Sequence, residues 1–288
     1  MGPAREEGGA MKKKRGAHRP RLPEQPFLTG TWSFPFSPGV RGRTLLLAVL
    51  AFAVGVLVRE SLRLMASGDG RLSFLGAMFT VLTVFAVMIW FALAGACALA
   101  VVGDTANGCD RIVRWPTAVF LDWIGETFVI ATGVGISVAP LVGLAWVSRQ
   151  VGSQSDGGVP VGFFFLFPVV LLSLLENGAL FDVVSLPLLR TFWVAPGGWG
   201  RFYLSTAILL LAAATIVVLT APTPGGGQLW GNAAIAVVSV MSSLVWLIYF
   251  RLLGRLAWFC ADRTAAVEAE AELKAELDAT EPEADAED

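Results

Sequence analysis

Four acidic residues are the side chains of this sequence that are best placed to do chemistry. Asp122, Glu126, Glu176 and Asp182 all lie beside long uncharged segments. Asp122 and Glu126 are four residues apart and therefore share one face of a helix. Acidic side chains at membrane depth usually face a bundle interior or a water-filled path, where they carry ions or protons. The pattern therefore fits a cation- or proton-coupled transporter in which Glu126 and Glu176 are the acceptors.

A structural role for the same acids is the competing interpretation. They can form ion pairs with nearby arginines, namely Arg111, Arg114, Arg190 and Arg251. The depth of Glu126 separates the two roles. If the hydrocarbon layer begins at residue 127, the 22 uncharged residues 127–148 suffice to cross it, and Glu126 lies among the headgroups. If the helix enters the layer at residue 119, Glu126 lies about 10 Å deep, at about 1.5 Å per residue.

The sequence contains no recognisable catalytic or cofactor motif. The patterns G-x-S-x-G, H-E-x-x-H and the Walker sequence do not occur. His18, the single histidine, lies in a basic N-terminal segment, so a histidine-based metal cage inside the membrane is excluded within one chain. Cys97, Cys109 and Cys260 lack C-x-x-C spacing and are predicted to be packing residues. We therefore predict no catalytic residues, no cofactor and no metal, and a protein that is not an enzyme.

The composition sets the class of the protein. Its mean hydropathy is +0.67 and 15% of its residues are charged, whereas about a quarter are charged in soluble domains. Uncharged segments recur, and the 49 residues 202–250 are divided by a Pro- and Gly-rich turn. We predict an all-α fold, a polytopic transmembrane helical bundle of about six spans with interfacial helices on the cytoplasmic side. The predicted spans are 43–65, 73–102, 118–148, 161–181, 202–221 and 229–255.

Two segments have more specific predicted roles. Ala92, Ala96 and Ala100 recur every four residues near the end of the second span, which predicts a small face that a neighbouring backbone can approach closely. Residues 182–200 combine prolines with Arg190, Trp193 and other aromatic residues. This mixture predicts an interfacial helix and loop at the membrane surface.

Charge is distributed unevenly between the two ends of the chain. Residues 1–43 carry nine Lys or Arg and three Glu, whereas residues 264–288 carry ten acids and one Lys. We predict a disordered basic tail (1–26), a six-span domain (27–263) and an acidic tail (264–288) that is helical and then disordered. The basic cluster at 12–15 either binds anionic lipid headgroups or only sets the topology. The acidic tail either recruits a protein partner, attracts the basic tail or is simply solvated, and no nucleic acid is expected to bind.

The basic residues also predict the orientation. With six spans and both termini in the cytoplasm, the cytoplasmic segments hold 17 Lys or Arg and the outer loops hold 4. Cytoplasmic loops of membrane proteins carry such an excess. We therefore expect a multi-pass protein of the cell membrane with both termini in the cytoplasm.

One family resemblance rests on two motifs. Residues 115–126, from Trp115-Pro116 to Glu126, and the run FPVVLLSLLEN at 167–177 resemble uncharacterised polytopic membrane proteins of planctomycete bacteria. The resemblance implies a bacterial cytoplasmic membrane and assigns no activity to either motif.

The function that the sequence favours is that of a non-enzymatic scaffold or partner-binding component of the membrane. The alternative is a small cation- or proton-coupled transporter or channel that uses the acidic residues of the third and fourth spans. Both interpretations share the lipid bilayer as the main partner.

Overall fold

The computed structural model describes most of the chain, and its regular structure is helical. The described residues are 23–113, 115–117, 120–150, 158–178, 184–220 and 228–280, without the side chains of 120–122, 228–230 and 277–280. Within these residues, six helices are long and apolar enough to cross a membrane, which confirms the predicted fold class. They are α1 (Arg41–Met65), α2 (Gly70–Ala106), α3 (Phe120–Gln150), α4 (Gly158–Asn177), α6 (Pro196–Thr220) and α7 (Gln228–Thr280).

Capping groups explain where several helices begin and end. Asp69 accepts a hydrogen bond from the Arg71 backbone N–H at 2.9 Å, so α2 begins at Gly70 and not at the predicted residue 73. Gly178 has a φ of +63°, in the left-handed region that glycine adopts without strain, and α4 ends one residue earlier. The predicted fourth span ran to residue 181, and residues 179–181 lie outside the described part of the chain.

The predicted interfacial segment 182–200 contains a short helix and the start of a long one. The short helix is α5 (Leu186–Val194), and α6 begins at Pro196, where proline fits the first turn of a helix. Leu188 and Thr191 of α5 are buried, whereas Trp193 is 88% exposed. Such an amphipathic helix with an exposed tryptophan suits the headgroup level of a membrane.

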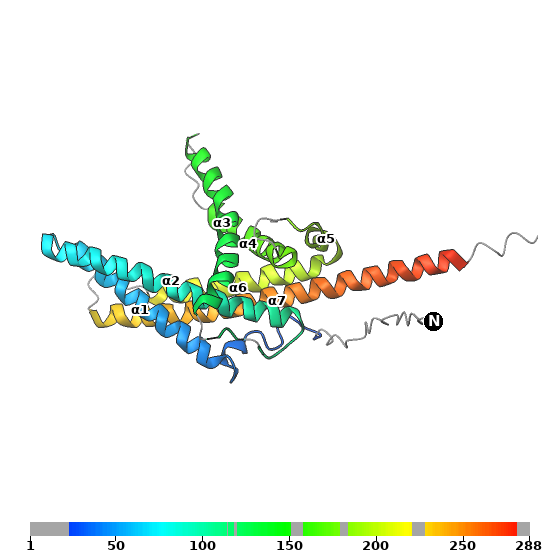
Figure 1. Cartoon of the computed structure of the whole chain (residues 1–288), viewed down its shortest axis with the longest axis horizontal. Coiled ribbons are helices and arrows are strands. Elements are labelled where there is room, and N and C mark those ends of the chain that lie inside the picture. Colours follow the sequence, from blue (N-terminus) through cyan, green and yellow to red (C-terminus); the bar gives the residue numbers. More distant parts are fainter. Residues whose placement is uncertain are drawn as a thin grey trace, which may run out of the picture.

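Four of the long helices run lengthwise along the molecule, crossing at an angle, and a fifth rises from them (Figure 1). In Figure 1, α1, α2, α6 and α7 run along the long axis of the molecule, and α3 rises steeply away from it. Leu47 of α1, Val101 of α2 and Leu247 and Leu253 of α7 are at most 1% exposed, so the core lies between these helices. One end of the bundle is called the α5 end below. Helices α1 and α6 begin there, and α2 and α4 terminate there.

The crossing of α3 over α2 uses the small face predicted from the sequence. Ala92 and Ala96 are buried, and Ala100 is half-buried. Thr127 of α3 donates a hydrogen bond to the backbone carbonyl of Ala92 at 3.4 Å. Small side chains allow this approach of one backbone to another, so the prediction of a small packing face is confirmed.

One helix extends far beyond the bundle. The 53 residues of α7 form one continuous helix that projects past the α5 end (Figure 1). The side chains of residues 265–276 are all exposed. The predicted acidic tail was expected to begin as a helix, and α7 runs through it to Thr280.

Candidate functional site

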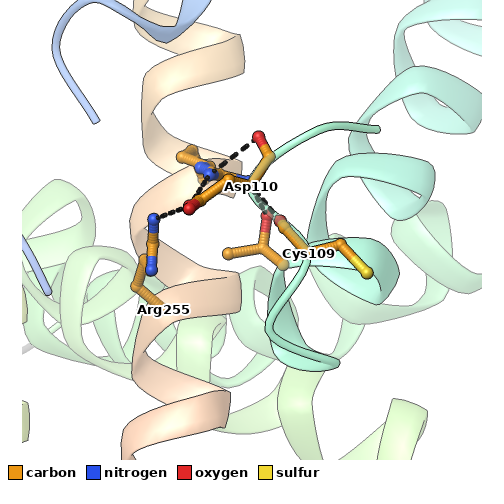
Figure 2. Close-up of polar contacts among 5 residues, drawn as sticks. Cys109, Asp110 and Arg255 are labelled. Atoms are coloured by element: carbon orange, nitrogen blue, oxygen red, sulfur yellow. Dashed lines mark hydrogen bonds and ion pairs between the residues drawn. The ribbon is translucent and has the colours of Figure 1, made fainter. Parts of the chain in front are cut away.

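Two buried arginines and one carboxylate form a polar cluster beside the connection between α2 and α3. Arg251 and Arg255 lie four residues apart on α7, and the side chain of each is 2% exposed. Asp110 lies in the connection between α2 and α3, which passes over this face of α7. Its Oδ1 atom accepts from Nη2 of Arg251 at 3.1 Å and from Nη2 of Arg255 at 2.5 Å (Figure 2). One carboxylate oxygen thus holds two guanidinium groups.

The other contacts of Arg251 tie α7 to the end of α2. Its Nη1 atom donates to the Thr105 hydroxyl at 2.7 Å and to the Cys109 carbonyl at 3.1 Å. Its Nη2 atom also donates to the Asp110 carbonyl at 3.2 Å. Gly254 of α7 permits the close approach of α7 to α2, because a Cβ added at Gly254 would lie 2.6 Å from the Thr105 Cβ. Arg251 therefore fixes the α2–α3 connection against α7.

Aromatic rings cover both guanidinium groups. The Arg251 Cζ atom lies 4.8 Å from the centre of the Phe34 ring, and the Arg255 Cζ atom lies 5.2 Å from the centre of the Trp258 ring. Phe34 belongs to a 3-10 turn, Phe34–Phe36, that precedes α1. Cation–π contacts of this kind stabilise a desolvated cation by about 2 kcal/mol. They offset part of the cost of burying the arginines.

The cluster has more positive charge and more donors than its acceptors can satisfy. Two guanidinium groups share one carboxylate. Nε of Arg251 and both Nε and Nη1 of Arg255 are buried and have no hydrogen-bond partner among the described residues. An unsatisfied buried donor costs about 1–3 kcal/mol, and more if it is charged. The site can therefore accept a further anion or hydrogen-bond acceptor.

Of the four predicted acids, the structure describes the side chains of Glu126 and Glu176, which lie on different helices, α3 and α4. Glu126 is half-buried in the first turns of α3. Glu176 is exposed at the end of α4 and accepts a hydrogen bond from the Ser185 hydroxyl at 2.5 Å. Ser185 in turn caps α5 by accepting from the Leu188 backbone N–H at 3.2 Å. The side chain of Asp122 and the whole of Asp182 lie outside the described residues.

The predicted arginines have different positions. Arg111 and Arg190 are exposed, and Arg114 lies outside the described residues. Arg251 is buried, but its carboxylate partner is Asp110, which the sequence interpretation left out of the polar cluster. The available signal was the i, i+4 pair of Arg251 and Arg255 at the end of an uncharged run. Two arginines that are buried on one helix face need an acid from another segment to offset their charge, but the sequence does not show that they are buried.

A groove at the α5 end collects several of the remaining polar groups. It has a volume of about 620 Å³ and lies between α2, α4, α5 and α7. Its lining is mostly apolar, with Glu176 from α4 and Glu268 from α7 among the polar side chains. Within the described residues, no three His, Cys, Asp or Glu side chains converge as a metal site requires.

Comparisons of the chain with family models, with curated proteins and with solved structures found no match. The geometry of the chain itself is therefore the basis for any functional assignment.

Proposed function

We propose that this protein is a non-enzymatic component of a membrane that holds an acidic helix in position for a partner. The observation that carries the proposal is the length of α7. At about 1.5 Å per residue its 53 residues extend about 80 Å, whereas the hydrocarbon layer is about 30 Å thick. We call the exposed residues 265–276 the acidic arm.

The charge of the acidic arm defines the kind of partner that fits it. The arm carries four glutamates, Glu268, Glu270, Glu272 and Glu276, against Lys274. A partner with a basic surface is therefore favoured, and charge complementarity speeds its association. The arm follows directly from a helix that is packed in the bundle, so its position relative to the membrane is fixed before a partner binds.

The location that we propose is the cytoplasmic membrane of a bacterium, with the acidic arm and both termini in the cytoplasm. The excess of Lys and Arg at the α5 end supports this orientation. The resemblance to planctomycete membrane proteins supports the compartment. A reporter fused to either terminus that is active only outside the cell would contradict the orientation.

The first prediction concerns the acidic arm. Changing its four glutamates to glutamine removes the charge and keeps good helix formers. Exposed ion pairs contribute about 0.2–1 kcal/mol each. We therefore expect the loss of four negative charges to lower the affinity for a basic partner about tenfold or more. The measurement is the amount of each protein that copurifies with the full chain at low and at high salt.

The matched control keeps the charge and changes the side chain. A variant with aspartate at the same four positions should retain the partner that the glutamine variant loses. If the glutamine variant copurifies with the same proteins in the same amounts as the unchanged chain, the acidic arm is not a docking element.

A transport function remains the second candidate because Glu176 and Glu268 line the same groove. A groove with carboxylates at its edge attracts cations, and a carrier would use them as acceptors. The second prediction is that liposomes containing the protein show the same proton and sodium flux as empty liposomes. Flux that is present with the unchanged chain and absent in Glu126→Gln or Glu176→Gln would instead establish the carrier.

A further inference from the structure

We propose that Arg251 and Arg255 form a binding site for a phosphate group, and that Asp110 occupies this site as an internal anion. This site is separate from the acidic arm and goes beyond the proposed docking function. It would take a phosphate monoester, as in the headgroup of phosphatidic acid, or free inorganic phosphate.

The donors of the two arginines converge on one point. Both Nη2 atoms contact the same oxygen, Oδ1 of Asp110, at 3.1 and 2.5 Å. Each guanidinium group presents a planar fork of N–H donors, which suits the oxygens of a phosphate. Arg251 is already held by the Thr105 hydroxyl and the Cys109 carbonyl, so half of the site is preorganised.

The unsatisfied donors of the cluster call for an anion with more oxygens than a carboxylate. Asp110 contributes one charge against two guanidinium groups, and Nε and Nη1 of Arg255 have no acceptor among the described residues. Figure 2 shows only one terminal nitrogen of Arg255 joined to Asp110. A phosphate carries up to two negative charges and at least three acceptor oxygens. It therefore satisfies both the charge and the hydrogen bonds better than Asp110 does.

Asp110 is able to leave the site. Its side chain is 76% exposed although both arginines are buried. A change of side-chain rotamer would move the carboxylate into water, and that movement needs no rearrangement of α7. The arginines would then face the opening that Asp110 had filled.

The site lies at the depth of lipid phosphates in the predicted topology. Arg251 follows immediately after the uncharged run 229–250, which is long enough to cross the hydrocarbon layer. Trp258, whose ring contacts Arg255, is a residue type enriched at the membrane surface. Both a lipid of the adjacent leaflet and phosphate from the aqueous phase would reach this position.

The third prediction uses Asp110→Asn, which removes the internal competitor. The full chain in phosphate-free detergent is titrated with inorganic phosphate, with phosphatidic acid or with phosphatidylcholine, and thermal unfolding is followed. We expect phosphate or phosphatidic acid to bind Asp110→Asn about tenfold more tightly than the unchanged chain, because an occupied site lowers the apparent affinity. Bound anion raises the unfolding temperature.

The titrations identify the source of the phosphate and have two controls. A response to inorganic phosphate supports a soluble ligand, and a response to phosphatidic acid alone supports a lipid headgroup. Arg255→Gln in the Asp110→Asn background should abolish the response, whereas Arg201→Gln, which changes an exposed arginine of α6, should preserve it. Equal responses to phosphatidic acid and phosphatidylcholine, with none to inorganic phosphate, would overturn the proposal.

A second measurement does not depend on the Asp110→Asn variant folding. In the unchanged chain, inorganic phosphate or phosphatidic acid at high concentration competes with Asp110 and should still raise the unfolding temperature. Arg255→Gln should remove that rise. If both proteins respond equally, or neither responds, the two arginines are not a phosphate site.

Discussion

Arg251→Gln is expected to lower the free energy of unfolding by about 3 kcal/mol, because a buried charge and its hydrogen bonds are lost together. Arg251 donates to Thr105, to the Cys109 carbonyl and to both the carbonyl and the carboxylate of Asp110. Glutamine is shorter and has one amide group, so it cannot reach α2 and the connection at once. This expected loss is near the low end of the range for breaking a buried ion pair, because the partner carboxylate of Asp110 is exposed to water.

Thermal unfolding in detergent measures this effect, and two variants define its origin. Arg201→Gln removes an exposed arginine of α6 and should change stability by less than about 0.5 kcal/mol. Arg251→Lys keeps the charge but loses the planar fork, so we expect an intermediate loss. A lysine variant as stable as the unchanged chain would show that charge alone matters at this position.

Gly254→Ala is expected to destabilise the protein by about 2 kcal/mol through overpacking at the contact of α2 with α7. The added Cβ would lie 2.6 Å from the Cβ of Thr105 and 3.0 Å from the Val102 carbonyl oxygen. Neither neighbour is the free end of a flexible side chain, so the two helices must separate. That separation would also draw Thr105 away from Arg251.

Gly135→Ala is the matched control for this substitution. Gly135 lies in the middle of α3, and a Cβ built there meets nothing within 4 Å. Alanine is a better helix former than glycine by about 1 kcal/mol, so this variant should be as stable as the unchanged chain or more stable. Equal losses at both positions would mean that close packing at Gly254 is not the cause.

The sequence predicted the helices well because uncharged runs leave few alternatives in a membrane. Long apolar segments must satisfy their backbone hydrogen bonds internally, and a helix does so within one segment. Ala92 and Ala96 were identified as a packing face for a similar reason, since only small residues allow helices to approach so closely. The helix limits differed where a local cap decided them, as at Asp69 and Gly178.

The candidate site was harder to predict because its partners are far apart in the chain. Arg251 was expected among the acids of the third and fourth spans, but its partner Asp110 comes from the connection between α2 and α3. No local sequence pattern predicts a contact between two residues that are 141 positions apart in the chain. Arginines at the end of a span normally extend into the headgroups. Here the connection covers them, so their burial is a tertiary effect.

The continuity of α7 links its two ends mechanically. The helix contains no proline between Gln228 and Thr280, so it lacks one of the common causes of a sharp kink. If α7 rotates as one rigid body, a partner that turns the acidic arm also turns the face that carries Arg251 and Arg255. Equilibrium coupling between two sites is reciprocal, so if a partner on the acidic arm alters anion binding at Arg251 and Arg255, the bound anion alters the affinity for that partner equally.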